Sequence, residues 1–177
     1  MDISNYRSTN DNHCCKGVLW LLGVEMLVFC DIDGVLADCN HRLHYLSEKN
    51  YDKFYSEEEM MNDKPIEEGL GLLEILLNDP FCRVVLLTGR PYRTEKQTRE
   101  WLKTYSYHKG IEKIDIVMRK DHDYRPSEVV KVEALKQFNT GDFKLGVLVI
   151  DDDPKNVVAV EKGVENCKGI LFGTSRL

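Results

Sequence analysis

Short apolar runs alternate along the chain with segments whose apolar residues recur at helical spacing. The apolar runs are nearly continuous and cover 27–30, 83–87, 114–118, 145–150 and 169–172. Such runs are typical of parallel strands that are buried on both faces of a sheet. The segments with helical spacing cover 66–77, 94–105, 127–138 and 154–164. This alternation predicts a three-layer α/β domain with right-handed crossovers and a central parallel sheet.

The stretch from about 40 to 64 interrupts the alternation with acidic and aromatic residues. We interpret it as a small, mostly helical cap that is inserted over the site. Its aromatic side chains could stack a nucleic-acid base or form the core of the cap, and the second interpretation is favoured. These aromatic residues are Tyr45, Tyr51, Phe54 and Tyr55.

The length of 177 residues suits one domain with a substantial core. Residues 1–25 are polar and Asn-rich until Gly17, and we interpret them as a tail or an over-extended start before a domain over 26–177. The apolar run 18–29 contains Glu25 and is too short to span a bilayer, so no membrane association is expected. The six cysteines form no CxxC pair, which favours a cytoplasmic protein without a zinc site or a disulfide framework.

The formal net charge is −6, but the charge is unevenly distributed. Residues 83–136 contain 13 Lys or Arg and eight Asp or Glu, so this segment is locally basic. The overall acidity argues against a protein that binds duplex DNA tightly without regard to sequence. It leaves room for a local site that binds an anion.

Two carboxylates follow the first predicted strand, at Asp31 and Asp33, and Gly34 comes next. Alternate side chains of an extended chain point to the same side, so both acids can converge on one small substrate. Gly34 allows a sharp turn and lets backbone amides approach an anion closely. Taken alone, the pattern also fits a turn with solvated acids or a fragment of a calcium loop.

The other predicted strands also end in groups that can handle phosphate. The second ends in Thr88-Gly89-Arg90, which offers a hydroxyl, backbone amides and a guanidinium. The third ends at Arg119, and Lys131 follows early in the next predicted helix. In parallel sheets the ligand lies at the carboxyl ends of the strands, so these side chains are expected to lie near one another.

The fourth predicted strand ends in Asp151 and Asp152. Carboxylates from the first and fourth strands would repel each other at one place unless a cation lies between them. Mg²⁺ is the expected cofactor, because carboxylate and phosphate oxygens suit its octahedral coordination.

In this order, at strand ends over 27–172, the motifs resemble the haloacid dehalogenase (HAD) superfamily of phosphohydrolases. The resemblance implies a Rossmann-like fold, with Asp31 as the nucleophile that forms an aspartyl-phosphate and Asp33 as the acid/base. It also implies that Thr88 binds phosphate and that Lys131 offsets charge on the phospho-aspartate.

The same resemblance implies which groups hold the metal. Asp31, the backbone carbonyl of Asp33 and Asp152 are the expected ligands. Asp151 is expected to act as a further ligand or to support the others.

A narrower resemblance concerns 115–131, where a strand ending in arginine precedes an Asp-rich loop with Arg-Pro and a Val-Val-Lys helix. This segment is similar to the 3′-phosphatase domain of phage-type polynucleotide kinases. Arg42, nine residues after the second aspartate, fits the same pattern. The resemblance implies that Arg42, Arg90 and Arg119, with Gly89, hold the substrate phosphate or the nucleotide.

The sequence departs from that family at Val35, where threonine is frequent, and at Asp153, where arginine can stand. No GxxxxGK[ST] loop occurs, so 5′-phosphorylation is not expected of this sequence.

The sequence thus predicts a Mg²⁺-dependent phosphomonoester hydrolase that acts on 3′-phosphorylated polynucleotide ends or on nucleotides. A 5′(3′)-nucleotidase, a small-molecule phosphatase and a non-catalytic phosphate-binding module are the alternatives. The oligomeric state, and whether a separate kinase or ligase works with the protein, are left open.

Overall fold

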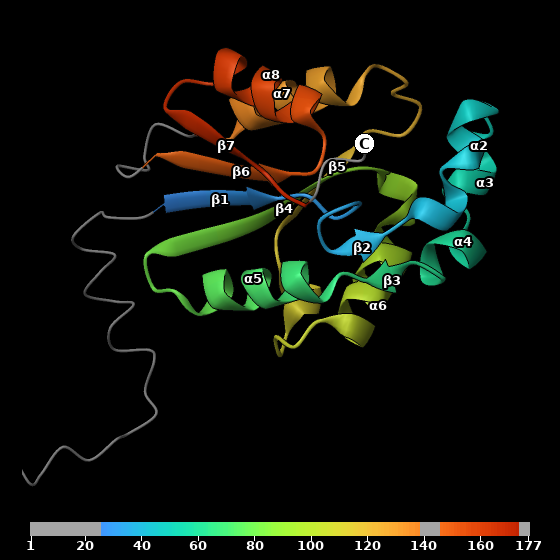
Figure 1. Cartoon of the computed structure of the whole chain (residues 1–177), viewed down its shortest axis with the longest axis horizontal. Coiled ribbons are helices and arrows are strands. Elements are labelled where there is room, and N and C mark those ends of the chain that lie inside the picture. Colours follow the sequence, from blue (N-terminus) through green and yellow to red (C-terminus); the bar gives the residue numbers. More distant parts are fainter. Residues whose placement is uncertain (1–25, 139–145, 174–177) are drawn as a thin grey trace, which may run out of the picture.

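A parallel sheet of five strands, in the order β5-β4-β1-β6-β7, forms the centre of the computed structural model, which describes residues 26–138 and 146–173 (Figure 1). Every pair of neighbouring strands in this sheet is parallel. The strands are β1 (Met26–Cys30), β4 (Cys82–Pro91), β5 (Ile116–Arg119), β6 (Val147–Asp151) and β7 (Cys167–Leu171).

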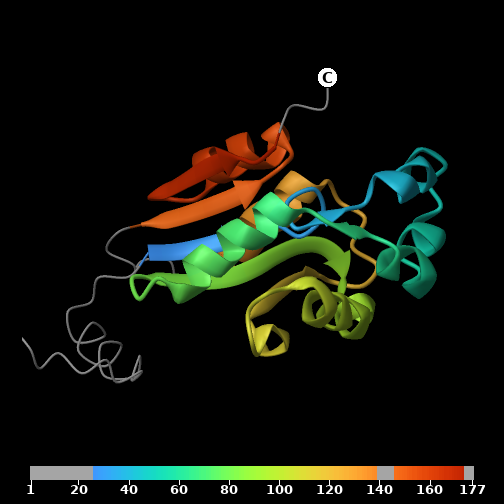
Figure 2. The same ribbon diagram turned by 60° about the horizontal axis from the view of Figure 1, so that its bottom comes forward.

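Helices cover both faces of the sheet, which gives the predicted three layers (Figures 1 and 2). One face carries α5 (Glu67–Asn78) and α6 (Glu95–Tyr105), and the other carries α7 (Ser127–Gln137) and α8 (Pro154–Gly163). Two short 3-10 helices, η2 (Tyr92–Thr94) and η3 (Ile111–Lys113), flank α6. Among the described helices, none is long and apolar enough to cross a membrane.

Strand β1 shows why its apolar run is continuous. Val28 and Cys30 belong to the core under α5 and α6, whereas Leu27 and Phe29 belong to the core under α7 and α8. Because successive side chains of a strand point to opposite faces, a strand with helices on both sides needs apolar residues at every position.

The five predicted strands and four predicted helices are confirmed, with their ends shifted by a few residues. The expectation that all five strands are buried on both faces is wrong for the two edge strands. The side chains of β5 are half-buried, and most of those of β7 are half-buried or exposed, because an edge strand is less covered by helices. The predicted tail 1–25 and residue 145 lie outside the described residues.

A small antiparallel pair, β2 (Ala37–Asp38) with β3 (Lys64–Pro65), begins and ends the inserted cap. Short helices lie between these strands: η1 (Asn40–Arg42), α2 (His44–Ser47), α3 (Tyr51–Phe54) and α4 (Glu57–Met61). Figures 1 and 2 show them beyond the carboxyl end of β1. The sequence indicated the helical content but not β2 and β3, because strands of two residues leave no apolar run.

Side-chain caps fix the starts of several helices near the site. Asn50 accepts a hydrogen bond from the Lys53 amide at the start of α3, and Ser56 accepts one from the Glu59 amide at the start of α4. Asp153 caps α8 in the same way, and the proline that follows it lies in the first turn of the helix.

Candidate active site

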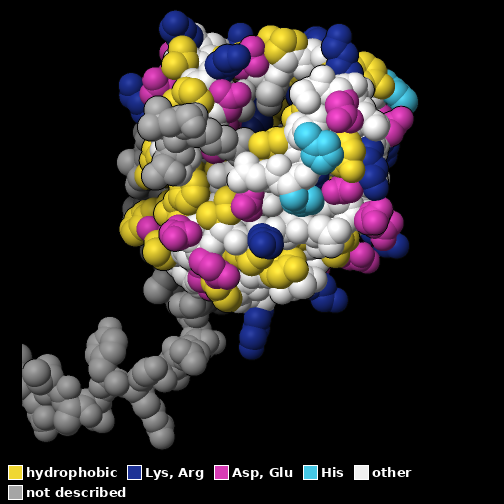
Figure 3. Space-filling view, turned by 45° about the vertical axis from the view of Figure 1, so that its right-hand side comes forward, with side chains coloured by type: hydrophobic (Ala, Val, Ile, Leu, Met, Phe, Trp, Pro, Cys, Tyr) yellow, Lys and Arg dark blue, Asp and Glu magenta, His cyan; other side chains and the backbone are white. Residues whose placement is uncertain are grey.

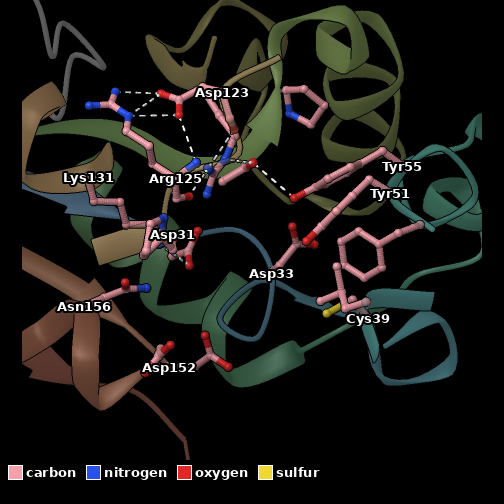
Figure 4. Close-up of a pocket in the computed structure, with 18 of the residues that line it drawn as sticks. Asp31, Asp33, Cys39, Tyr51, Tyr55, Asp123, Arg125, Lys131, Asp152 and Asn156 are labelled. Carbon is pink, nitrogen blue, oxygen red and sulfur yellow. Dashed lines mark hydrogen bonds and ion pairs between the residues drawn. The ribbon is translucent and has the colours of Figure 1, made fainter. Parts of the chain in front are cut away.

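A cavity of about 860 Å³ opens at the carboxyl end of the sheet, between the core and the cap (Figure 3). Asp31, Asp33, Lys131 and Asp152 line one end of it. The other end is lined by the cap and by the segment 119–127. Figure 4 shows the carboxylates and Lys131 on one side and the tyrosines of the cap reaching in from the other. The strand ends that the sequence singled out therefore do meet at one place.

Lys131 holds two aspartates from neighbouring strands. Its Nζ donates to Asp31 Oδ2 and to Asp151 Oδ2, each at 2.6 Å. All three side chains are buried. Burial alone would lower the pKa of Lys131, but the two carboxylates outweigh it and raise that pKa above its usual value. Lys131 is therefore a fixed ammonium beside the predicted nucleophile.

The raised pKa of Asp31 favours a further cation at the site. Burial raises the pKa of Asp31 to about 8, Asp151 adds to this effect, and Lys131 opposes it. A carboxylate must be ionised to act as a nucleophile. A divalent cation beside Asp31 would favour the ionised form, as positive charge does for any carboxylate.

The chemistry of the donors fits such a cation. Asp31, Asp151 and Asp152 each offer a carboxylate oxygen, and these oxygens lie within 4.8 Å of one another. Asn156 adds a buried Oδ1 that accepts no hydrogen bond from the described residues, while its Nδ2 donates to Asp151. Buried oxygens without a donor are rare, and hard oxygen ligands are those that Mg²⁺ prefers. These residues therefore suit Mg²⁺.

The turn after β1 brings its backbone against Asp152. Gly34 has a φ of +88°, in the left-handed region, and its amide donates to the Ala37 carbonyl. A Cβ on Gly34 would lie 2.1 Å from Asp152 Oδ2, well inside van der Waals contact. The glycine is therefore required both by the backbone conformation and by the carboxylate that packs on it.

Two arginines grip Asp33. Arg42 and Arg90 each place an Nη2 2.6 Å from Asp33 Oδ1, and each also lies 2.7 Å from Asp63 Oδ2. Burial favours a protonated Asp33, but Arg90 and then Arg42 outweigh it and lower its pKa to about 2. Asp33 is therefore held as a carboxylate in a fixed orientation.

This arrangement changes the role expected of Arg42 and Arg90. The resemblance implied that they hold the substrate phosphate or the nucleotide, but both are fully buried and neither is among the residues that line the cavity. A direct contact with substrate would require these side chains or their neighbours to move. The structure instead favours a role in orienting Asp33.

The remaining predicted residues lie around the β4 end. Thr88 is buried, and its Oγ1 accepts a hydrogen bond from the Arg90 amide. Gly89 and Arg119 line the cavity, and Arg119 Nε donates to the Gly89 carbonyl at 3.0 Å. Arg119 Nη1 donates to the carbonyls of Asp123 and Arg125, so this arginine also shapes the loop that follows β5.

Sequence reasoning missed Asp63 and Asn156. Asp63 lies at the end of the cap, 30 residues beyond Asp33, in a stretch with many acids, so no local pattern marks it. Asn156 lies in the first turn of α8, five residues after Asp151. That spacing after an acidic strand end was a usable signal.

The model of the polynucleotide kinase PNKP phosphatase domain matches residues 25–165, which is most of the chain. The chain belongs to this family. The match confirms the predicted resemblance to the phosphatase domain of polynucleotide kinases. A comparison with curated proteins gives no match.

Solved structures confirm the fold. A structure of a Pnkp1/Rnl/Hen1 complex has a TM-score of 0.64 at 20% identity and covers 87% of this chain and 48% of that chain. A structure of a Pnkp1/Rnl/Hen1 RNA repair complex has a TM-score of 0.63 at 20% identity, and the match covers 98% of this chain and 48% of that chain. A haloacid dehalogenase-like hydrolase from Streptococcus pneumoniae has a TM-score of 0.55 at 13% identity, and the match covers 80% of this chain and 82% of that chain. The chain spans about half the length of the first two, and at these identities the likeness shows the HAD-like fold alone.

Proposed function

We propose that this protein is a Mg²⁺-dependent phosphatase that removes the 3′-phosphate from polynucleotide ends through an aspartyl-phosphate. The observation that carries the proposal is the position of Asp31 at the cavity. Its Oδ2 accepts a hydrogen bond from Lys131 Nζ at 2.6 Å. Its carboxylate also forms part of the oxygen cluster with Asp151 and Asp152.

The chemistry divides into two displacements at phosphorus. Asp31 attacks, the bond to the 3′-oxygen breaks, and Asp33 gives that oxygen a proton. Asp33 then takes a proton from a water that attacks the phospho-aspartate, which restores Asp31 and releases inorganic phosphate. Bound Mg²⁺ would offset the charge on the phosphate oxygens and on Asp31, with Asp152 among its ligands. Lys131 would offset the rest of that charge.

The arginine pair affects these two steps differently. Arg42 and Arg90 favour the carboxylate form of Asp33, which suits the base that activates water. The first step needs the protonated form, which the guanidiniums oppose. We therefore expect the rate of this step to depend on the leaving group. Asp33→Asn should lower the rate more for an alkoxide than for a good leaving group such as p-nitrophenolate.

A polynucleotide end is favoured as the substrate for three reasons. The chain belongs to a polynucleotide kinase phosphatase family. The cavity extends well beyond the volume of a phosphate group, and its far end is lined by basic side chains from 119–125. Structural neighbours come from a complex named for RNA repair, so RNA ends are the first substrate to test. Because that structure is a complex of several proteins, we also propose that this chain works beside other RNA-repair proteins.

Phosphate release with and without Mg²⁺ tests the proposal. The panel holds 3′-phosphorylated RNA and DNA oligonucleotides, 3′- and 5′-mononucleotides and glycerol phosphate. We expect the oligonucleotides to have the highest kcat/KM, and Asp31→Asn to lower it by about 10³-fold or more. Asp115→Asn, which removes an exposed carboxylate paired with Arg83, is the matched control and should keep the activity.

Other outcomes would point to the alternatives. A higher kcat/KM on mononucleotides would favour a 5′(3′)-nucleotidase, and one on glycerol phosphate would favour a small-molecule phosphatase. No release from any ester, with Mg²⁺ present, would overturn the proposal in favour of a phosphate-binding module.

A further inference from the structure

Two tyrosines from different parts of the chain meet at the cap side of the cavity. Tyr51 begins α3 of the cap, and Tyr124 lies in the loop between β5 and α7. Their ring centroids are 5.8 Å apart with an interplanar angle of 47°. Both line the cavity, although they remain 39% and 69% exposed.

Phe54 and Tyr55 of the cap also line the cavity, but each has a contact that holds it to the rest of the protein. Phe54 is 4% exposed, and the Arg42 guanidinium lies 4.3 Å from its ring centroid. The Tyr55 hydroxyl donates to the Gly89 carbonyl at 3.2 Å. The interpretation of these aromatics as cap core is therefore correct for Phe54 but wrong for Tyr51, which faces the cavity (Figure 4).

Tyr51 and Tyr124 differ from Tyr55 in that their hydroxyls have no polar partner among the described residues. Within 26–138 and 146–173, neither hydroxyl makes a hydrogen bond to another residue. The pair thus leaves large aromatic surfaces in contact with water. Aromatic rings kept at the wall of a cavity are well suited to stack on a flat ligand.

The charges around the pair indicate what kind of flat ligand fits. The cavity wall near the tyrosines contains several basic residues and the acidic Asp123. These basic residues are Arg93, Arg119, Lys120 and Arg125. Lys120 forms no ion pair with any described residue, so its ammonium is available to an anion. Arg93 pairs with Asp52, and Arg125 pairs with Asp123 and Glu133, so Lys120 and Arg119 supply most of the unbalanced positive charge beside the rings. Positive charge beside an aromatic surface is the arrangement that binds single-stranded nucleic acid.

The size of the cavity agrees with such a ligand. Its volume of about 860 Å³ is in the upper part of the range for sites that bind drug-sized molecules. A phosphate group at Asp31 would occupy a small part of it. The remaining space extends to the tyrosines and has room for the sugar and base attached to that phosphate.

We propose that Tyr51 and Tyr124 form a stacking platform for the nucleobase of the 3′-terminal nucleotide. This inference rests on the proposed function, because it assumes that the phosphate at Asp31 belongs to a nucleotide. Every base has a flat π-face, so the platform adds affinity without reading the sequence. It makes an end that carries a base a better substrate than an abasic end.

The test compares two 3′-phosphorylated oligonucleotides that differ only in whether the terminal nucleotide carries a base. We expect the base to lower the KM of the unchanged protein by about 5- to 100-fold. The double variant Tyr51→Leu/Tyr124→Leu should lose this difference while kcat changes less than about two-fold. The double variant with Phe at both positions keeps the rings and should retain the difference. Tyr107→Leu, an exposed tyrosine that does not line the cavity, is the matched control.

Activity on glycerol phosphate, which has no ring, distinguishes a failure of the stacking platform from a loss of structure and from a failure of the proposed function. Equal KM values for the two oligonucleotides in the unchanged protein would overturn the platform while leaving the phosphatase proposal intact. A Leu variant that loses activity equally on glycerol phosphate would show a structural role and would also overturn it. An absence of hydrolysis of every ester would instead refute the proposed function, and the platform with it.

Discussion

At the scale of single residues, the site depends on how closely backbone and side chains approach. Gly34 lies where the chain turns off β1, and the Asp152 carboxylate occupies the space in which a Cβ would stand. Gly110 has almost the same φ, +85°, but no atom lies within 4 Å of its Cβ position. Replacing each glycine by alanine therefore separates the free-energy cost of the positive φ from the cost of the steric contact with Asp152.

We predict that Gly34→Ala destabilises the protein more than Gly110→Ala and also weakens metal binding. Gly110→Ala should cost about 1–2 kcal/mol of unfolding free energy, because alanine disfavours a left-handed backbone. Gly34→Ala adds the displacement of Asp152, so the Mg²⁺ concentration for half-maximal activity should rise about 10-fold or more. Urea unfolding and Mg²⁺ titrations measure these effects. Equal losses of stability with an unchanged Mg²⁺ requirement would contradict this prediction.

At the scale of elements, the cap is joined to the sheet through the same groups that orient Asp33. Asp63, at the end of the cap, accepts hydrogen bonds from Arg42 of η1 and Arg90 of β4. Its backbone carbonyl accepts a hydrogen bond from Trp101 Nε1 of α6 at 2.9 Å. Two buried guanidiniums share the buried carboxylate of Asp63 and the partly exposed carboxylate of Asp33, so the charges in the cluster balance. The position of the cap and that of the acid/base are therefore coupled.

We predict that Asp63→Asn lowers the unfolding free energy by about 3–5 kcal/mol, because it leaves the two buried arginines with one carboxylate between them. Asp52→Asn is the matched control, since Asp52 is a fully exposed cap residue that pairs with Arg93. Its loss should leave the unfolding free energy nearly unchanged, because water screens an exposed ion pair. Chemical denaturation of both variants provides the measurement. A loss below 1 kcal/mol for Asp63→Asn would show that the buried cluster does not tie the cap to the core.

At the scale of the whole molecule, the order of the strands assembles the site. β1 lies between β4 and β6, so the strand ends that carry Asp31, Thr88 and Asp151 are neighbours at one edge of the sheet. Helix α7 then brings Lys131 to the same edge. Carboxylates gathered in this way repel one another, and Lys131 offsets only part of that charge.

We predict that Mg²⁺ stabilises the folded protein, because it binds the oxygen cluster only when the strands are assembled. At a concentration 100 times Kd the gain is about 2.7 kcal/mol, which appears as a rise in Tm. Thermal unfolding in Mg²⁺ and in EDTA, at matched ionic strength, measures it. Asp152→Asn should lose most of the rise, whereas Asp115→Asn, an exposed carboxylate, should keep it. A Tm that does not respond to Mg²⁺ in the unchanged protein would refute the metal site.

The predictive power of the sequence was greatest where the signal is local. Continuous apolar runs identified the strands because helices cover both faces of the central ones, as at Leu27 and Val28. The pattern of acids after β1 and β6, with the lysine early in α7, identified the groups that meet at Asp31. Such motifs can be recognised in the sequence because a parallel sheet brings the carboxyl ends of its strands together at one edge.

The layers and the sheet edge that holds the site could thus be predicted from sequence patterns, and the family resemblance placed Lys131 near Asp31. The pairing of Arg42 and Arg90 with Asp33 and Asp63, and the contact of Tyr51 with Tyr124 at the cavity wall, could be found only in the folded chain. These contacts join segments far apart in the chain and depend on how the cap packs on the sheet. An arginine or a tyrosine looks the same in sequence whether packing buries it in an ion pair or leaves it at a cavity wall.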